Sequence, residues 1–258
     1  MVDADLKSYF DTIPHERLME RVGEKIADGK VLNLIEGMLQ AGVMDSIEGW
    51  QATKQGSPQG AVISPLLSNI YLNGLDWKMA HNGFEMVRYA DDFVVLCSSQ
   101  EEAQKTLEQV KQWVEENGLK LHPTKTRVVD ASQRGGFDFL GYHFERGKKW
   151  PRKKSLDKLK DAIRSKTRRN SGRSMKAICR DLNPTLKGWY EYFKHSVPHV
   201  FGSIDGYVRG RLRSILRRQT KRKGRARGTD QCRWPNTYFT AAGLFSLRQA
   251  RAAACRST

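Results

Sequence analysis

The chain has 258 residues, of which 28% are charged and 39% are hydrophobic. This balance excludes a disordered tail and a membrane-spanning protein, and the length allows one or two compact domains. The chain has no run of about 18 consecutive apolar residues, and its N-terminal segment lacks the basic-then-apolar profile of a signal peptide. We therefore expect a cytoplasmic protein that has no membrane partner.

The net charge of +17 is distributed unevenly along the chain. Residues 1–145 carry 14 basic and 22 acidic side chains, whereas residues 146–258 carry 31 basic and 6 acidic ones. An excess of one sign this large is self-repelling unless a counter-charge is bound, so we expect the second part to bind nucleic acid. The alternative, a ribosomal-type RNA-binding protein, leaves the acidic part unexplained.

Short strands and helices alternate through the acidic part. Apolar periodicity and capping residues predict helices over residues 14–26 and 31–39 and helices that open at Ser64-Pro65 and at Ser99. Strand-like runs cover residues 2–6, 84–90, 93–97, 126–129 and 137–144. This order predicts an α+β domain built on an antiparallel sheet.

The sequence Tyr89-Ala90-Asp91-Asp92 is the centre of the acidic part. Only Asp91 and Asp92 separate the two strand-like runs around them, which predicts a tight hairpin with both aspartates in its turn. Adjacent carboxylates repel each other, and a divalent cation removes that conflict. A solvated turn without a ligand is the alternative, because aspartate is common in turns.

A third carboxylate from a neighbouring strand would complete a site for two Mg²⁺ ions, which prefer oxygen ligands. Two such ions activate an attacking hydroxyl and stabilise a leaving pyrophosphate. Asp5 lies at the end of the first predicted strand. Asp3 projects to the same face because side chains alternate along a strand, so the alternation does not decide between the two.

The basic part is predicted to be helical, because apolar residues recur at helical spacing through residues 156–163, 186–193 and 204–216. Six basic side chains lie opposite the last of these stripes or follow it: Arg209, Arg213, Arg217, Lys221, Arg222 and Lys223. We expect them to bind the phosphates of a nucleic acid without reading its sequence. A solvated helix face is the alternative.

In their order, these segments resemble the group II intron reverse transcriptase/maturase family. Five blocks carry the resemblance: Asp5-Leu6-Lys7-Ser8-Tyr9-Phe10, Gly56-Ser57-Pro58-Gln59-Gly60, Tyr89-Ala90-Asp91-Asp92, Gly118-Leu119-Lys120-Leu121 with Lys125, and Phe139-Leu140-Gly141-Tyr142. Leu182-Asn183-Pro184 with Gly188-Trp189 resembles the maturase signature. Arg233-Trp234-Pro235-Asn236 resembles the C-terminal end of bacterial members.

The resemblance implies a reverse-transcriptase palm over residues 1–148, an all-α thumb/maturase domain over 149–224 and a small DNA-binding segment over 225–258. It implies an RNA-directed DNA polymerase that uses two Mg²⁺ ions to add dNTPs to a DNA primer on an RNA template. Group II intron RNA, whose splicing the protein would assist, and a DNA target site are the further implied partners, in the bacterial cytoplasm.

The resemblance also implies roles for single residues. The catalytic, metal-binding triad is matched by Asp5, Asp91 and Asp92. The dNTP site is matched by Phe10, Gln59 and Lys125, with the Phe10 ring excluding a 2′-hydroxyl. The grip on the primer end is matched by Leu140, Gly141 and Tyr142. The alternatives are a core aromatic at Phe10, a turn amide at Gln59, a surface lysine at Lys125 and an ordinary bulged strand at Leu140–Tyr142.

The family has a fingers region before its first aspartate block and a nuclease segment of the His-Asn-His type, and neither is present in these residues. We therefore expect an N-terminally truncated, endonuclease-lacking member that polymerises poorly alone, because its nucleotide pocket lacks a wall. One competing hypothesis is a catalytically impaired maturase that acts only as an RNA-binding splicing cofactor. Another is an RNA-dependent RNA polymerase, which Phe10 disfavours.

Overall fold

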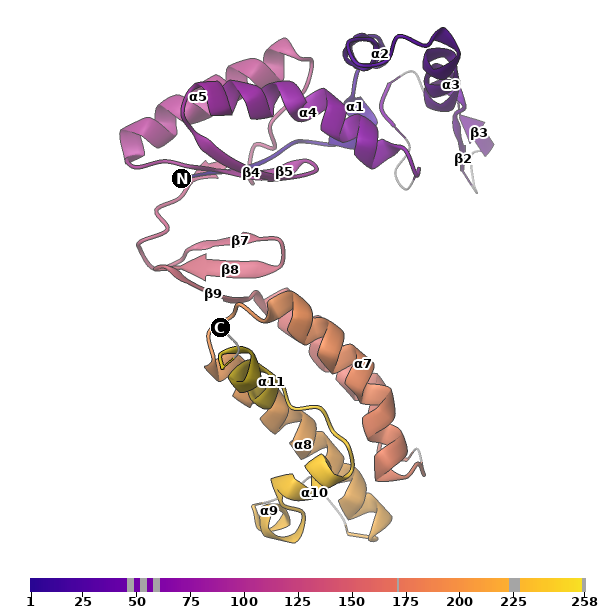
Figure 1. Ribbon diagram of the computed structural model, residues 1–258, viewed down its shortest axis with the longest axis vertical. Helices are drawn as coiled ribbons and strands as arrows, with labels where there is room; N and C mark the ends of the chain where they lie inside the picture. Colours follow the sequence, from indigo (N-terminus) through magenta and orange to yellow (C-terminus); the bar gives the residue numbers. More distant parts are fainter. Residues whose placement is uncertain (46–48, 52–54, 58–60, 171, 223–227, 257–258) are drawn as a thin grey trace. The chain divides into compact units, whose positions relative to one another are not determined.

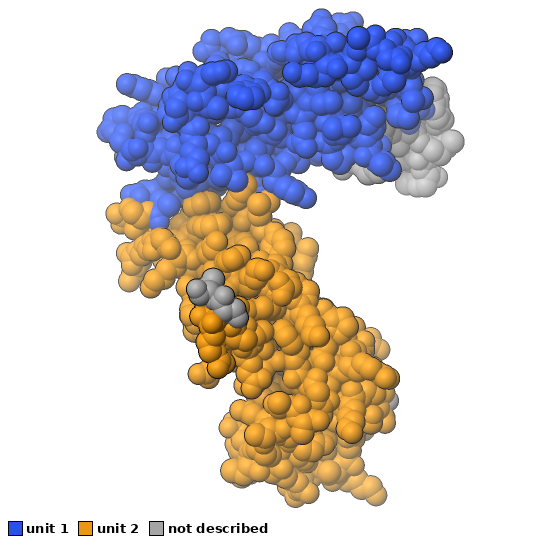
Figure 2. Space-filling view, viewed as in Figure 1, with its two compact units in different colours: residues 1–131 blue, residues 132–258 orange. Residues whose placement is uncertain are grey.

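The computed structural model describes the chain except for residues 46–48, 52–54, 58–60, 171, 223–227 and 257–258. The chain divides into two compact units, Met1–Ala131 and Ser132–Thr258 (Figure 2). Each unit has its own hydrophobic core. None of the helices in the described ranges is both long and apolar enough to span a bilayer. The division into functional domains at residues 148 and 224 stays a prediction.

Unit 1 is an antiparallel sheet with helices packed on it (Figure 1). The sheet has the strand order β4-β5-β1-β6, with β1 (Val2–Asp5), β4 (Glu85–Tyr89), β5 (Asp92–Leu96) and β6 (Arg127–Val128). Two short strands, β2 (Val43–Asp45) and β3 (Gly49–Gln51), pair separately. The helices are α1 (Tyr9–Thr12), α2 (His15–Gly23), α3 (Gly29–Gln40), α4 (Ser64–His81) and α5 (Gln100–Glu116).

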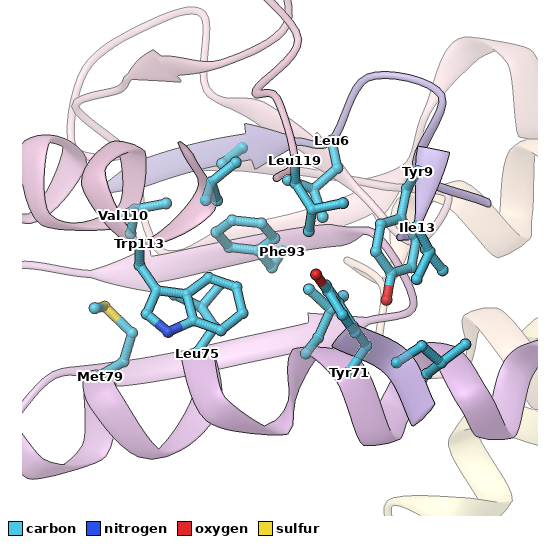
Figure 3. Packing of buried hydrophobic residues seen from close by; sticks show 14 of the residues in the cluster. Leu6, Tyr9, Ile13, Tyr71, Leu75, Met79, Phe93, Val110, Trp113 and Leu119 are labelled. Carbon is cyan, nitrogen blue, oxygen red and sulfur yellow. The ribbon is translucent and has the colours of Figure 1, made fainter. Parts of the chain in front are cut away.

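One face of the sheet is buried under α4 and α5. Phe93 of β5 is fully buried, in the same core cluster as Leu75 of α4 and Trp113 of α5 (Figure 3). Full burial of a side chain of this size stabilises the fold by about 1.5–3 kcal/mol. The opposite face is not covered in the same way, because Val87 and Tyr89 of β4 are 43% and 68% exposed. The sheet therefore has one face for packing and one face that a ligand can reach.

The two serines predicted to cap helices behave differently. Ser99 accepts a hydrogen bond from the backbone N–H of Glu102 at 3.1 Å, which confirms the predicted start of α5. The serine-proline pair predicts Ser64 as the N-cap of α4, but Ser64 is the first residue of the helix. Its hydroxyl lies instead 2.6 Å from the hydroxyl of Ser57, so it is not available to cap the helix.

The hairpin between β4 and β5 differs by one residue from the prediction. Tyr89 pairs with Asp92, so the two-residue turn consists of Ala90 and Asp91. The prediction that both aspartates lie in the turn is wrong for Asp92, which is the first residue of β5. Asp92 also pairs with Asp5 of β1. Its backbone thus belongs to a three-stranded ladder, which local turn propensity does not reveal.

Unit 2 begins with the antiparallel sheet β7-β8-β9 and continues with helices. The strands are β7 (Phe137–Phe139), β8 (Tyr142–Glu145) and β9 (Lys148–Pro151). The helices are α6 (Lys153–Lys166), α7 (Met175–Phe193), α8 (His199–Gln219), α9 (Thr229–Arg233), α10 (Asn236–Ala241) and α11 (Leu247–Ala254). The prediction of one strand over 137–144 is wrong, because Leu140 and Gly141, with φ of 48° and 81°, form a turn inside it.

The predicted apolar stripes form the core of unit 2. Leu159 of α6, Leu186 of α7 and Leu212 of α8 are all buried. Trp234 and Phe239, from the C-terminal segment, belong to the same core cluster. This segment therefore belongs to the core of unit 2, and its helix α11 packs onto α7 and α8.

Candidate active site

Strand pairing places two acidic residues directly opposite each other on the exposed face of unit 1. Asp5 of β1 is the register partner of Asp92 of β5, and Tyr89 of β4 pairs with Asp92 from the other side. Direct partners in an antiparallel ladder project to the same face. Asp91 adjoins this row at the hairpin turn, so the three predicted carboxylates lie together.

The structure distinguishes Asp5 from Asp3. Asp3 lies one row further along the strand, where its partners are Val94 of β5 and Arg127 of β6. The guanidinium Nε of Arg127 donates to Oδ2 of Asp3 at 3.2 Å. Asp3 is therefore engaged away from the hairpin, and Asp5 is the third carboxylate of the group.

The charges of these groups shift one another's pKa values. Burial raises the pKa of the Asp91 carboxyl, and the negative charge of Asp5 raises that pKa further. Lys125 opposes this effect. The hydrogen bond to Asp5 raises the pKa of the Lys125 ammonium, and the charges of Asp91 and Asp92 add to the rise. The site thus concentrates negative charge around a single ammonium group.

The backbone beside β1 brings that ammonium to Asp5. The N–H of His122 donates to the Asp5 carbonyl at 2.8 Å, and the N–H of Lys7 donates to the Lys120 carbonyl at 2.8 Å. These bonds hold the segment before Lys125 along the end of β1. The Lys125 Nζ then lies 2.5 Å from Oδ2 of Asp5, with 59% of the lysine side chain exposed. The predicted Lys125 therefore lies at the cluster of three aspartates.

The donor chemistry of this group fits a divalent cation. Carboxylate oxygens are the ligands that Mg²⁺ prefers in proteins. With the side chains as they stand, no three His, Cys, Asp or Glu residues in the described part of the chain form a ready metal cage. Asp5 is paired with Lys125 instead. An exposed ion pair of this kind contributes only about 0–1 kcal/mol, so a cation can displace the lysine.

Ser57 is bonded to the backbone of Phe10. Ser57 donates its N–H to the Phe10 carbonyl at 2.6 Å. Gly56 has a φ of 81°, and a Cβ at that position would lie 2.6 Å from the same carbonyl oxygen. The Phe10 ring packs edge-on against Tyr9, with 5.4 Å between the ring centroids. Gln59, predicted to contact the nucleotide, lies outside the described residues.

The predicted primer-grip residues lie at the β7–β8 hairpin of unit 2, with Leu140 and Gly141 in its turn and Tyr142 at the start of β8. The Tyr142 hydroxyl donates to the Tyr192 carbonyl at 2.6 Å, and the Tyr192 hydroxyl donates to the Leu140 carbonyl at 2.7 Å. The Gly141 carbonyl accepts from the Arg152 N–H and the Ser155 hydroxyl, each at 2.9 Å. The turn is therefore anchored to α6 and α7 within its own unit.

The prediction of an open basic face on α8 is wrong. Arg213 and Arg217 are each only 7% exposed. Arg213 donates to the Trp234 carbonyl at 3.0 Å, and Arg217 donates to both carboxylate oxygens of Asp230 at 3.1 Å. Burial lowers the pKa of Arg213. The C-terminal segment covers this face, so these arginines hold the fold together.

Arg209 also lies near a charged partner within the protein, Asp205. Its guanidinium lies 3.9 Å from the Asp205 carboxylate, which is buried and caps the start of α11 by accepting from the N–H of Leu247 at 3.0 Å. Of the remaining predicted contacts, Lys221 and Arg222 are exposed, and Lys223 lies outside the described residues. Further exposed basic side chains of the long helices include Lys153, Lys154, Lys158, Lys176 and Arg180.

Arg88 is not among the residues that the sequence predicts for this site. This residue lies at an inward-facing position of β4, next to the hairpin, and its side chain is 10% exposed. The available signal was the alternation of Arg88 with the apolar Phe84 and Met86, because a charge on the apolar side of a strand requires internal partners.

Two family models match the chain. The model described as "Reverse transcriptase (RNA-dependent DNA polymerase)" matches residues 1–144. The model described as "Group II intron, maturase-specific domain" matches residues 156–234. The first covers more than half of the chain and includes all three carboxylates, Phe10 and Lys125.

Two curated proteins are similar to this chain in sequence. Protein YkfC of Escherichia coli (strain K12) is 30% identical over 182 residues, which cover 57% of this chain and 47% of that protein. The group II intron-encoded protein LtrA of Lactococcus lactis subsp. cremoris is 30% identical over 55% of this chain and 34% of that protein. The chain spans less than half the length of either relative. It belongs to the reverse transcriptase family, as a group II intron-encoded reverse transcriptase/maturase with a palm and a helical maturase domain.

Proposed function

We propose that this chain carries the polymerase centre of an RNA-directed DNA polymerase that adds dNTPs to a DNA primer on an RNA template. One observation carries the proposal, namely the register pairing of Asp5 with Asp92 beside Asp91 on the exposed face of the sheet. Membership of the reverse transcriptase family supports it. Reverse transcriptases generally use divalent metal ions, and the donor set fits them.

Asp5, Asp91 and Asp92 would hold two Mg²⁺ ions. Such a pair of ions supplies activation of the primer 3′-hydroxyl and stabilisation of the leaving pyrophosphate. Lys125 provides the countercharge for Asp5 when no cation is bound. Because its side chain is long and mostly exposed, we infer that it turns from Asp5 toward the triphosphate of an incoming nucleotide.

Phe10 and Gln59 would form the nucleotide pocket. The hydrogen bond from the Ser57 N–H to the Phe10 carbonyl supports this assignment, because it ties a residue two positions before Gln59 to the backbone of Phe10. A ring held at this point leaves no room for a 2′-hydroxyl, so dNTPs would be selected over ribonucleotides. In unit 2, Leu140, Gly141 and Tyr142 would contact the primer end.

The maturase domain would bind the group II intron RNA and assist its splicing, with a DNA target site as a further partner. The match over residues 156–234 and the 31 basic against 6 acidic residues from 146 onward support an RNA partner. We assign phosphate contacts to exposed side chains such as Lys176, Arg180, Lys221 and Arg222. The buried Arg213 and Arg217 are not included.

A non-catalytic splicing cofactor is the second candidate function, favoured by the separate maturase-domain match. Primer extension on poly(rA)/oligo(dT) with Mg²⁺ distinguishes the two, using the parent chain and its Asp91→Asn/Asp92→Asn variant. RNA binding is measured for both proteins over a range of salt concentrations. We expect extension by the parent alone and equal RNA affinity. The polymerase proposal fails if neither protein extends the primer while both bind RNA.

A further inference from the structure

Arg88 extends from β4 toward the helix-covered side of the sheet. Its register partner on β5 is Phe93, which is fully buried. Register partners share a face, so Arg88 lies behind the sheet relative to Asp5 and Asp92. A guanidinium that is only 10% exposed at this position must be held by strong polar partners.

Two residues of α4 supply those partners. The Nε and Nη2 atoms of Arg88 donate to the two carboxylate oxygens of Asp76 at 2.7 Å and 2.5 Å. Its Nη1 donates to Oδ1 of Asn69 at 3.0 Å. This bidentate pair of hydrogen bonds to a carboxylate fixes the orientation of the guanidinium and is stronger than a single bond. The guanidinium is therefore fixed to the helix.

The same Nη1 atom also reaches the hairpin turn. It donates to the Ala90 carbonyl at 3.1 Å. Ala90 has a φ of 56°, in the left-handed region that a residue with a Cβ disfavours. The Ala90 carbonyl and the Asp91 N–H belong to one planar peptide group. Holding the oxygen therefore orients the backbone that carries the Asp91 side chain.

We propose that Arg88 is a positioning residue for the metal site, and that Asp76 and Asn69 anchor it. It holds the Ala90–Asp91 peptide in place, and Asp91 is one of the three residues that would hold the metal ions. The inference rests on the proposed function, because that function makes Asp91 a metal ligand. Residues that support a ligand in this way typically change metal affinity or activity by about 10–100-fold when removed.

Mn²⁺ binding to the full chain, followed by electron paramagnetic resonance, tests the proposal directly. We expect Arg88→Met to weaken the affinity about tenfold. Arg88→Lys should recover little, because an ammonium cannot reproduce the planar fork. Arg21→Met is the matched control, since Arg21 forms an exposed pair with Glu24 on α2. Asp91→Asn marks the signal that belongs to this site.

Primer extension adds a second readout. A lost positioning role lowers kcat by about the same factor as the Mn²⁺ affinity and leaves the KM for dNTP within about twofold. A merely structural role lowers the unfolding temperature without changing the Mn²⁺ affinity of the folded protein. Parent-like Mn²⁺ affinity in folded Arg88→Met therefore overturns the proposal.

Two milder variants decide the matter if Arg88→Met does not fold. Asn69 is exposed, and alanine favours the helix, so Asn69→Ala is expected to fold. Asp76→Asn keeps a partner of the same shape. Each should weaken Mn²⁺ binding about two- to threefold, and parent-like affinity in both overturns the proposal.

The Mn²⁺ measurement also separates this inference from the proposed function. A parent chain that binds Mn²⁺ through Asp91 but extends no primer refutes the polymerase activity, and the Arg88 variants still decide the positioning role. A parent chain whose Mn²⁺ binding does not depend on Asp91 overturns the positioning proposal.

Discussion

The ammonium of Lys125 lies 2.5 Å from a carboxylate oxygen of Asp5, and the register partner of Asp5 is Asp92. The lysine thus neutralises part of the negative charge of Asp5, Asp91 and Asp92, which would otherwise repel one another strongly. This pairing makes the lysine a competitor for any cation that binds there, in addition to a candidate contact for the nucleotide.

Lys125→Ala should therefore have opposite effects on metal and nucleotide. Loss of an exposed ion pair worth up to about 1 kcal/mol should strengthen Mn²⁺ binding by up to about fivefold. Nucleotide incorporation should fall, because the triphosphate loses a cation. Titration of Mn²⁺ and steady-state primer extension measure the two effects. Lys105→Ala, at an exposed position on α5, is the control. Weaker Mn²⁺ binding by Lys125→Ala would contradict the assignment.

Asp5→Asn and Asp3→Asn should differ sharply although the residues share one strand face. Asp5→Asn removes a proposed metal ligand, whose loss costs several kcal/mol of transition-state stabilisation, so primer extension should fall by roughly 100-fold or more. Asp3→Asn loses an ion pair with Arg127 and should keep activity within about fivefold. Circular dichroism checks that both variants fold. Equal loss of activity in both would show that the row containing Asp92 is not the site.

Gly56→Ala should destabilise unit 1 more than Gly83→Ala. Both glycines have positive φ, 81° and 77°, so each substitution costs about 1–2 kcal/mol of backbone strain. Only at Gly56 would the new Cβ lie 2.6 Å from backbone atoms of Phe10 and Asp11, which adds about 1–3 kcal/mol. Urea denaturation of the two variants measures the difference. Equal free energies of unfolding would mean that this segment is not fixed to α1.

Arg217→Gln and Arg180→Gln should separate fold stability from RNA binding. Arg217 pairs with the buried Asp230, so its loss should destabilise unit 2 by about 3–5 kcal/mol. Arg180 is exposed on α7, so its loss should leave the stability unchanged. The slope of log RNA affinity against log salt concentration should become shallower by about one, because one phosphate contact is lost. Thermal unfolding and RNA titrations at several salt concentrations give both quantities. The reverse pattern would restore α8 as the RNA-facing helix.

Much of the architecture follows from local sequence rules. The capping pair Ser99 and Glu102, the apolar stripes of the helices and the strand-like runs predict the α+β unit and the helical unit, because these signals depend on residues close together in the chain. The ordered motif blocks indicate the reverse transcriptase family, which the family match confirms. The uneven charge indicates a nucleic-acid partner for the second part.

Other features depend on contacts between residues far apart in the sequence, and only the tertiary structure decides them. The pairing of β1 with β5 selects Asp5 over Asp3 and draws Asp92 out of the turn. The C-terminal segment buries Arg213 and Arg217. Their helical spacing alone predicts an exposed basic surface. The bonds from Arg88 to Asp76, Asn69 and Ala90 join a strand, a helix and a turn. A periodic pattern reports which side of an element a residue occupies, whereas the register and the covering segment determine what that residue meets.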